Sequence, residues 1–194
     1  MASRASMLPY LQRIKDFSHT LSPQAMKAIE ACFQKKSYKK GAHLLKPSWI
    51  CSGHHMIQKG ILRKYFIEGE REITTEIYLP GDVAIALDSY LSQLPSQVYL
   101  EAVTDAELTT VDKRSFDTAR KNFPELNQLD RLFAEYYAVW FERRLRETQT
   151  LSASDRYREL LECEPHLLQL LPLTIIASFL NVSPETLSRI RSAI

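Results

Sequence analysis

The sequence lacks the cysteine patterns that hold disulfide frameworks and metal clusters together. Its three cysteines, Cys32, Cys51 and Cys163, are far apart and show no CxxC or Cys/His spacing. We therefore expect neither disulfides nor a zinc or iron–sulfur site, and three buried free thiols instead. Glycine is also scarce, with five residues in the chain, and no Gly-rich phosphate loop, nucleophile elbow or paired-carboxylate motif occurs.

Long apolar stretches are missing as well. No apolar run approaches the length that a membrane-spanning helix needs, and the N-terminal residues MASRASMLPYLQRIKDF lack the continuous apolar core of a signal peptide. We therefore expect a cytoplasmic protein that does not enter a membrane. With 194 residues, 45% of them hydrophobic, the chain is long enough for one medium domain and a small one.

The histidines show no pattern that favours a metal-dependent enzyme of the cupin type. His54 and His55 are adjacent, so on a strand they point to opposite faces, and no nearby carboxylate completes a metal triad. His19, His43 and His166 are scattered. We therefore expect no catalytic residues, no metal and no cofactor, and we predict that the protein is not an enzyme.

The last two dozen residues, LPLTIIASFLNVSPETLSRIRSAI, have the spacing of two short helices joined by a tight turn. Apolar residues recur with helical period from near Thr174. Asn181 tolerates the left-handed conformation found after a helix C-terminus, so it can replace Gly there. Ser183, Pro184 and Glu185 then restart the helix, because Ser caps an N-terminus, Pro suits the first helical position and Glu favours the positive helix end.

The second helix of this pair separates apolar from polar side chains. Leu187 and Ile190 face inward, and the other side carries a carboxylate, hydroxyls and guanidinium groups suited to a DNA major groove. A DNA-binding helix-turn-helix is one interpretation, and an ordinary terminal helical hairpin is the other. The predicted DNA-binding residues are Ser183, Pro184, Glu185, Thr186, Ser188, Arg189 and Arg191.

The net charge of +2 hides a strong asymmetry. Residues 1–50 carry nine Lys/Arg against two Asp/Glu, and residues 51–112 carry four against ten. Residues 151–194 carry four against five, so the predicted DNA-binding end is not basic. Because phosphate neutralisation supplies most non-specific affinity for DNA, we expect weak, salt-sensitive binding unless a dimer presents two copies or other segments of the chain contribute.

The sequence pattern from about residue 42 to residue 112 is typical of short β-strands. The segments HHMIQKG, ILRKYFIEG, REITTEIYL, QVYLEAV and AELTTVD alternate or are rich in β-branched residues, and turn residues separate them. They predict an antiparallel barrel or jelly roll, with tight turns at Glu68-Gly69-Glu70 and Pro80-Gly81-Asp82 and a short helix from Leu87 to Leu91.

Two helices are predicted before these strands, one from Leu8 to Phe17 and one that begins at Ser22-Pro23. The lysine-rich segment KKSYKKG follows them. Its lysines are interpreted as gatekeepers of a solvated strand edge, or alternatively as a site for an acidic partner.

A helix much longer than its neighbours is predicted to begin at Pro124. The segment PELNQLDRLFAEYYAVWFERRLRETQTL places aromatic and apolar side chains along one side. Such a helix packs wholly on its own barrel or pairs with its copy in a two-fold dimer, and we favour the dimer. Ser152 to Ser154 end it, and Asp155 to Cys163 forms a further helix. The predicted dimer contacts are Leu129, Phe133, Tyr136, Tyr137 and Trp140.

N-terminal helices, a small β barrel, a long central helix and a C-terminal helix-turn-helix, in this order, resemble the Crp/Fnr family of bacterial transcription regulators over nearly the whole chain. The residues that carry the resemblance are PGD at 80–82, the central helix and the ending IASFLNVSPETLSRIR. The resemblance implies an α+β protein in three parts. These are a cyclic-nucleotide-binding-like sensor domain over 1–123, a dimerisation helix over 124–151 and an all-α DNA-binding domain over 152–194.

The resemblance also implies how the parts work together and which residues meet DNA. The ligand state of the barrel alters the central helices and so the placement of two recognition helices. Ser183, Pro184, Glu185 and Arg189 match family positions where side chains meet bases and phosphates. Pro184 departs from the Arg of the best-known members, so one base contact is lost and a different preferred site is expected.

The sensor departs further from the cyclic-nucleotide-binding members of the family. There, a Gly-Glu-Leu motif holds the ribose through Glu, and Arg-Ser-Ala holds the cyclic phosphate through Arg. This chain has Ile85-Ala86-Leu87 and Ser96-Gln97-Val98 at those places. A buried phosphate without its charge partner costs several kcal/mol, so we expect neither cyclic AMP nor cyclic GMP to bind. An oxygen-sensing iron–sulfur centre is not expected either, because an N-terminal cysteine cluster is missing.

Two interpretations of the sensor stay open. Its apolar side chains line a pocket for another small, more apolar molecule, or they fill the barrel of a scaffold that binds no ligand. The predicted pocket residues are Val83, Ile85, Ala86, Leu87, Ser96, Gln97 and Val98.

The sequence therefore predicts a sequence-specific DNA-binding transcriptional regulator that acts as a homodimer on a palindromic operator. An unidentified small-molecule effector and RNA polymerase are its further candidate partners. The alternative is a dimeric module of the same fold that binds a ligand or a protein and has lost DNA binding. The absence of a basic C-terminal region and of a winged hairpin after Arg191 keeps this alternative open.

Overall fold

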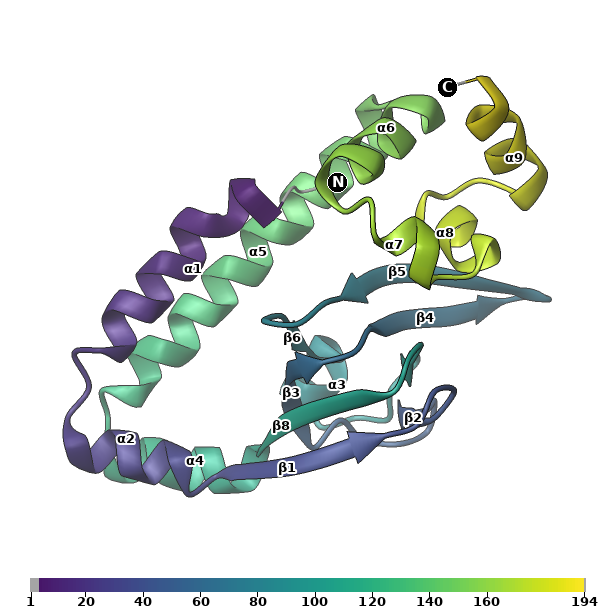
Figure 1. Cartoon of the computed structure of the whole chain (residues 1–194). Coiled ribbons are helices and arrows are strands. Elements are labelled where there is room, and N and C mark those ends of the chain that lie inside the picture. The colour runs from purple at the N-terminus through teal and green to yellow at the C-terminus, as the bar shows by residue number, and fades with distance from the viewer. Residues whose placement is uncertain (1–3, 194) are drawn as a thin grey trace. The chain divides into compact units, whose positions relative to one another are not determined.

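The computed structural model describes residues 4–193, and their helices and antiparallel sheets confirm the predicted α+β class. The chain divides into two compact units. One unit is Lys27–Lys121, and the other combines the residues up to Met26 with those from Asn122 onward. Figure 1 labels the elements of both units. The three domains predicted from the sequence, with boundaries at 123 and 151, stay a prediction, as does the jelly-roll path of the strands.

Within Lys27–Lys121, strands build two antiparallel sheets. The strand order is β1-β8-β3-β6 in one sheet and β2-β7-β4-β5 in the other. Helix α3 (Leu87–Ser92) follows β6, and α4 (Lys113–Asn122) follows β8. The strands are β1 (Phe33–Tyr38), β2 (His43–Leu45), β3 (Gly53–Lys59), β4 (Leu62–Glu68), β5 (Arg71–Tyr78), β6 (Val83–Ala84), β7 (Tyr99–Ala102) and β8 (Ala106–Asp112).

Alternation along the strands directs one side of each sheet into the core. On β5, Thr74, Glu76 and Tyr78 are buried, whereas the residues between them are half-buried. Leu62 of β4 and Leu100 of β7 have no exposed surface. Burying one such leucine stabilises the fold by about 1.5–3 kcal/mol. The period of two that predicted β5 is therefore the period of its burial, whereas β4 and β8 are buried over runs of consecutive residues.

Both predicted tight turns are confirmed. β4 and β5 pair from Glu68 with Arg71, so two residues form the hairpin loop, and Gly69 there has a φ of 61°. At the second turn Gly81 has a φ of 91°, and the side chain of Asp82 accepts a hydrogen bond of 2.7 Å from the N–H of Leu79. Positive φ is the conformation in which Gly avoids the clash of a side chain.

The lysine-rich segment after α2 forms an edge strand, as the gatekeeper interpretation predicted. β1 pairs with β8 and lies at the end of its sheet. Its first five residues are exposed. Lys39, just beyond the strand, forms an ion pair of 2.7 Å with Asp105. Charged side chains on an exposed strand oppose pairing with another chain.

The other unit is helical. Its N-terminal helix α1 (Arg4–Ser18) runs alongside the long helix α5 (Leu126–Thr150) (Figure 1). Arg13 of α1 forms an ion pair of 3.2 Å with Glu135 of α5. Helix α2 (Pro23–Glu30) leads from α1 to β1. Its N-cap residue Ser22 donates through both its N–H and its hydroxyl to the Glu125 carboxylate, at 3.0 and 2.7 Å.

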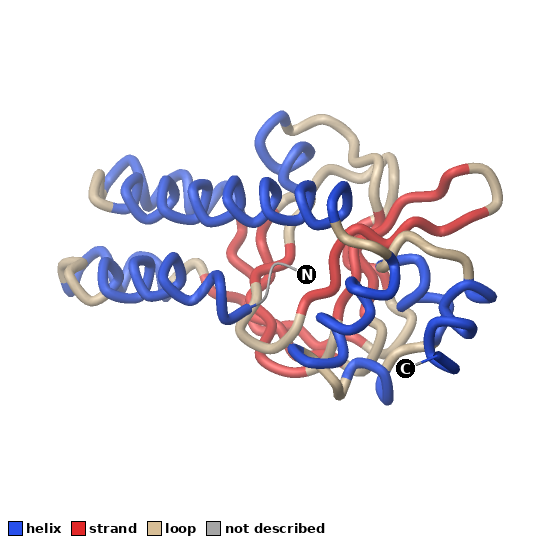
Figure 2. The backbone as a smooth tube through the Cα atoms, turned by 90° about the horizontal axis from the view of Figure 1, so that it is seen from above, coloured by secondary structure: helices blue, strands red, loops and turns tan. Residues whose placement is uncertain are grey.

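Short helices follow α5 to the C-terminal end of the described chain (Figure 2). They are α6 (Ala153–Cys163), α7 (Leu167–Leu170), α8 (Leu173–Phe179) and α9 (Pro184–Ala193). Ser152 caps α6 by accepting a hydrogen bond of 3.1 Å from the N–H of Asp155. The predicted break after the long helix is therefore confirmed, whereas the single turn of α7 was not predicted.

Two details of the sequence-based prediction are wrong. The long helix begins at Leu126 rather than at Pro124, because the N–H groups of Leu126 and Asn127 bond to Phe123 and Pro124 in a turn before it. Cys32 and Cys51 are buried as expected, but Cys163 is exposed. Cys163 lies in the last turn of α6, beyond the buried face of that helix, which ends at Leu160.

Candidate functional site

The turn between α8 and α9 is closed by hydrogen bonds at the C-terminus of α8. The N–H of Asn181 donates to the carbonyl oxygen of Ser178, and the N–H of Val182 donates to that of Ala177, both at 3.0 Å. Asn181 has a φ of 55°. This pattern is the Schellman motif, which needs a left-handed residue that Asn tolerates better than most. The predicted role of Asn181 is confirmed.

The start of α9 is also as predicted. The hydroxyl oxygen of Ser183 accepts a hydrogen bond of 3.2 Å from the N–H of Thr186, which makes Ser183 the N-cap. Pro184 is the first residue of the helix, where its missing N–H costs nothing. Hydrogen bonding from the Ser183 side chain lowers the pKa of Glu185, and the positive charge of Arg189 lowers it further. A negative charge is thus present in the first turn of α9 at neutral pH.

The structure brings all seven predicted DNA-binding residues together on α9 and its N-cap. Leu187 is 1% exposed and Ile190 is 9% exposed, so these two side chains anchor the helix from its inner side. Thr186 is half-buried beside them. The remaining six are exposed: Ser183, Pro184, Glu185, Ser188, Arg189 and Arg191.

Two arginines that the sequence reasoning missed lie at the C-terminus of α8. Arg144 of α5 donates to the carbonyl oxygen of Phe179, and its guanidinium lies over the Phe179 ring at 4.2 Å from the centroid. Arg156 of α6 donates to the carbonyl oxygen of Leu180 at 3.1 and 2.9 Å. Because their acceptors are backbone carbonyls, no pattern of side chains in the sequence marks these contacts.

The long helix α5 divides its predicted dimer contacts between two environments. Leu129 and Tyr137 are buried within the single chain. Phe133, Tyr136 and Trp140 are half-buried. Another side of α5 faces α1. There a guanidinium nitrogen of Arg143 lies 3.8 Å from the sulfur of Met7, and the guanidinium carbon lies 5.8 Å from the centroid of the Tyr10 ring.

An exposed apolar stripe runs along a different side of α5. Its residues are Ala134, Ala138, Phe141 and Leu145, and their spacings of four, three and four residues are those of a coiled-coil seam. Phe141 is 41% exposed and Leu145 is 59% exposed. This coiled-coil spacing can be read in the sequence. The sequence-based prediction instead chose the neighbouring face of the helix, because that face carries more large aromatic residues.

The buried side of the β2-β7-β4-β5 sheet contains an ion pair. The ammonium group of Lys64 contacts the carboxylate of Glu76, and the two residues are register partners on β4 and β5. The hydroxyl of Tyr78 donates to the same carboxylate. Lys64 is 8% exposed and Glu76 is 2% exposed. A charged pair of this kind needs complete partners, because either ion alone would be costly in the core.

The fold of this chain is similar to the folds of several solved structures. No protein-family model matches the sequence, and no curated protein is similar to it in sequence. FixK2 from Bradyrhizobium japonicum is similar in structure, with a TM-score of 0.64 at 20% identity over 83% of each chain. A protein from Eubacterium rectale assigned to the Crp/Fnr family of transcriptional regulators has a TM-score of 0.66 at 22% identity, over 89% of this chain and 82% of its own. This chain has the Crp/Fnr fold.

A third protein with the Crp/Fnr fold extends the comparison. It is the global regulator CLP of Xanthomonas campestris, described as responsive to c-di-GMP, with a TM-score of 0.63 at 14% identity over 89% of this chain and 91% of its own. At these identities the similarity shows the fold. The order of N-terminal helices, antiparallel sheets, long helix and short C-terminal helices in this chain is therefore that of the Crp/Fnr fold.

Two residues of the predicted sensor segment were expected to replace the nucleotide-binding side chains, and the structure shows the environment of each. Ala86, predicted to stand in place of the ribose-binding Glu, is buried. Ser96, predicted to stand in place of the phosphate-binding Arg, is 2% exposed. Its hydroxyl accepts from the N–H of Val98 at 3.0 Å and donates to the Val98 carbonyl oxygen at 2.9 Å. Ser96 thus stabilises its own turn.

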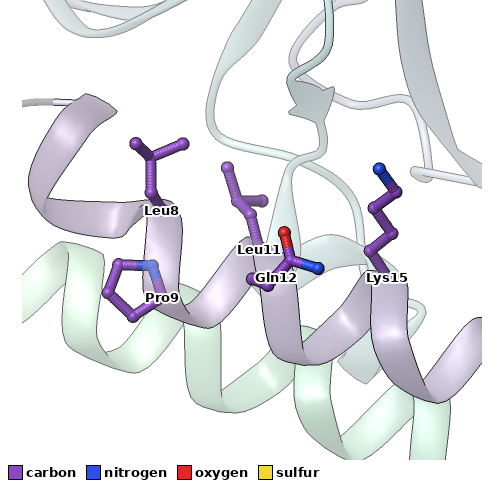
Figure 3. Close-up of a pocket in the computed structure, with 5 residues that line it drawn as sticks. All are labelled: Leu8, Pro9, Leu11, Gln12 and Lys15. Atoms are coloured by element: carbon purple, nitrogen blue, oxygen red, sulfur yellow. The ribbon is translucent and has the colours of Figure 1, made fainter.

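The remaining predicted pocket residues are not all directed inward. Ile85 is buried, whereas Val83, Leu87 and Val98 are half-buried and Gln97 is exposed. A shallow pocket lies elsewhere, along α1 (Figure 3). It is lined by Leu8, Pro9, Leu11, Gln12 and Lys15, of which Leu8, Leu11 and Lys15 project from the same side of the helix. That the sensor segment binds a ligand stays a prediction.

Among residues 4–193, no three His, Cys, Asp or Glu side chains are grouped as a metal site requires. No helix in the same range combines the length and the hydropathy needed to cross a membrane.

Proposed function

We propose that this protein is a sequence-specific DNA-binding transcriptional regulator that reads a palindromic operator as a homodimer. The observation that carries the proposal is α9. Its inner side is anchored by Leu187 and Ile190, and its outer side presents a carboxylate, hydroxyls and guanidinium groups to solvent. With α8 and the Asn181 turn, α9 forms a helix-turn-helix in which it takes the place of the recognition helix.

Glu185 and Arg189 are the residues that we assign to base reading. They are one helical turn apart, both are exposed, and the charge of Arg189 favours the ionised form of Glu185. An Arg guanidinium pairs with the acceptors of guanine, and a carboxylate accepts from the amino group of cytosine. Ser183, Thr186, Ser188 and Arg191 flank them and are assigned to phosphates or base edges, while Pro184 offers no side-chain donor.

A homodimer follows from two observations. The charge of residues 151–194 is −1, from four basic and five acidic side chains, so a single copy has little electrostatic affinity for DNA. The exposed stripe on α5, with Phe141 and Leu145, offers an apolar seam for a second copy. We assign the seam to this stripe together with the half-buried Phe133, Tyr136 and Trp140, and we assign Leu129 and Tyr137 to packing within the chain.

We further propose that the protein is cytoplasmic and has no enzymatic activity. RNA polymerase is its candidate protein partner, and any effector of the sensor is a molecule other than cyclic AMP or cyclic GMP. The replacement of both nucleotide-gripping residues, at Ala86 and Ser96, supports the second statement.

Selection of bound sequences from random DNA with the full-length protein tests the proposal. We expect enrichment of a palindromic site, because two copies of α9 related by a two-fold axis read identical half-sites. The Arg189→Ala variant should lose about 1–3 kcal/mol of discrimination at one base pair of each half-site. Arg158→Ala is the matched control, since Arg158 is exposed on α6 and paired with Asp155 at 2.8 Å.

A dimeric module that binds a ligand or a protein and not DNA is the second candidate. The negative charge of residues 151–194 favours it. Selection that enriches no sequence at low salt, from protein that is dimeric and folded, would support this candidate and reject DNA reading.

A further inference from the structure

The C-terminus of α8 is the place where three helices of one unit meet. The last carbonyls of a helix lack intrahelical donors and carry partial negative charge. In α8, the carbonyls of Ala177 and Ser178 are bonded within the turn, and those of Phe179 and Leu180 accept from arginines of other helices. Phe179 and Leu180 are the two residues before Asn181, where the chain turns toward α9.

Arg156 joins the ends of two helices through one guanidinium group. Its Nε and one terminal nitrogen donate to the carbonyl oxygen of Leu180, after α8. The other terminal nitrogen donates at 2.6 Å to the carbonyl oxygen of Leu151, after α5. Arg156 is 8% exposed. A guanidinium presents its donors in a fixed plane, so these bonds define both the separation and the angle of the two helix ends.

Arg144 adds a second connection from the body of α5. It donates to the Phe179 carbonyl oxygen and stacks on the Phe179 ring, so one residue of α8 contacts both a donor and the face of the guanidinium. The neighbouring Arg143 points to Met7 and Tyr10 of α1 instead. Consecutive arginines of α5 therefore bind different helices.

We propose that Arg144 and Arg156 form a joint that fixes the direction of α8 and α9 relative to α5, so that a movement of α5 reaches the recognition helix through these helix-end carbonyls. The effect of this movement on DNA binding rests on the proposed function. The joint itself is a statement about the geometry of the helical unit. Both arginines are positioning residues that lie outside the DNA-reading surface.

Distances between spin labels test the joint without DNA. In a Cys163→Ser background, labels are attached at the exposed positions Glu142 of α5 and Ser192 of α9 after substitution by Cys. Labelled chains are diluted with unlabelled protein, so that only distances within one chain are recorded. We expect one narrow distance for the parent, a broadened or shifted distribution for Arg144→Leu, and an intermediate result for Arg144→Lys, which keeps the charge and loses the planar fork.

Matched variants separate the joint from general loss of stability. Arg143→Leu removes a neighbouring guanidinium from α5, and Arg158→Leu removes an exposed one from α6; both should keep the parent distance. Phe179→Leu removes the stacked ring without touching an arginine and should broaden the distance as Arg144→Leu does. Helix content from circular dichroism identifies variants that fail to fold, and Arg144→Lys and Phe179→Leu keep the test decisive in that case.

Binding to the selected DNA site is the second measurement. We expect Arg144→Leu to weaken it about tenfold, the size of one lost charge-assisted hydrogen bond, with the preferred sequence unchanged. An unchanged distance distribution in Arg144→Leu and Phe179→Leu would overturn the joint, whatever the DNA affinity. A broadened distance in a protein that selects no DNA would support the joint and reject the proposed function.

Discussion

Acid should destabilise this protein well above the pH at which its carboxylates are protonated, because two adjacent histidines of β3 are held neutral. His55 is 9% exposed, and its Nδ1 shares a hydrogen bond of 2.9 Å with the hydroxyl of Thr110. His54 lies edge-on to the rings of Tyr90 and Phe116, each at a centroid distance of 5.9 Å. Burial lowers the pKa of both histidines from 6.5 to about 4.

The direction and size of the effect follow from proton linkage. Above pH 6.5 the folded and unfolded chains both carry neutral imidazoles, so these groups make stability independent of pH. Below 6.5 the unfolded chain binds protons that the folded chain does not bind until about pH 4. The free energy of unfolding therefore falls by about 1.4 kcal/mol per histidine and pH unit, or roughly 2 kcal/mol per histidine at pH 5.

Other groups with shifted pKa values act in a lower window. Hydrogen bonds to Lys39 lower the pKa of Asp105, and hydrogen bonds to Ser22 lower that of Glu125. Their ordinary values are 3.8 and 4.5, so the stability linked to them is present above these values and is lost only as the pH falls below them. Between pH 6.5 and 5 the fall in stability therefore belongs mainly to the histidines.

Urea unfolding at pH 7.0, 6.0 and 5.0 measures the effect. The double variant His54→Phe and His55→Gln removes both titrating rings and keeps an aromatic side chain and a hydrogen-bonding amide. Its free energy of unfolding should be nearly flat across this range, even if it is lower than the parent's at pH 7. His166→Gln is the control for replacing an imidazole by an amide at the surface, because the His166 side chain is 51% exposed. A double variant that loses as much stability as the parent between pH 6.5 and 5 would refute the reasoning.

Three further outcomes are expected. Gly60→Ala should destabilise by about 2–4 kcal/mol in urea unfolding, because Gly60 has a φ of +90° and a Cβ there would lie 2.3 Å from the Asp105 carbonyl oxygen. Gly69→Ala, with a φ of +61° and nothing within 4 Å, should cost only about 1 kcal/mol; equal losses would contradict the steric argument. Phe141→Glu should give monomers in sedimentation, and a retained dimer would place the interface elsewhere. If Arg191 contacts a phosphate in each copy of the dimer, Arg191→Ala should make the log–log slope of DNA affinity against salt less negative by about 2; an unchanged slope would place the phosphate contacts on other segments.

Sequence periodicity predicted the long elements and missed β2, β6 and α7 for a physical reason, although it did predict the short helix α3 (Leu87–Ser92). On β5 burial alternates over the six residues from Ile73 to Tyr78, which confirms the period of two, but the buried side carries Thr74, Glu76 and Tyr78, whereas Ile73 and Ile77 are half-buried. β2 has three residues and β6 has two, and strands of this length are too short to show a period. β2 forms because it pairs with β7, and β6 forms because it pairs with β3. α7, with four residues, is a single turn between Pro165 and Pro172 and likewise has no periodic signal.

The candidate site shows the same division between local and non-local information. The Asn181 turn and the Ser183 cap use atoms within a few residues of each other, and the sequence predicted both. The contacts of Arg144 and Arg156 join residues that are 35 and 24 positions from their acceptors. Their acceptors are main-chain carbonyls, which every residue has. Such contacts become visible only when the helices are placed in space.

If the unit of β-sheets binds an effector, as proposed, the buried pair of Lys64 and Glu76 restricts the charge of that effector. An anionic effector at this side of the sheet would have to compete with Glu76 for Lys64, and a cationic effector with Lys64 for Glu76. Leaving either ion unpaired in the core costs about 3–5 kcal/mol. That cost corresponds to a factor of about 150 to 5,000 in affinity. We therefore expect any molecule that enters the core beside this pair to be uncharged, since only an uncharged molecule leaves the hydrogen bond of Tyr78 to Glu76 and the ion pair intact.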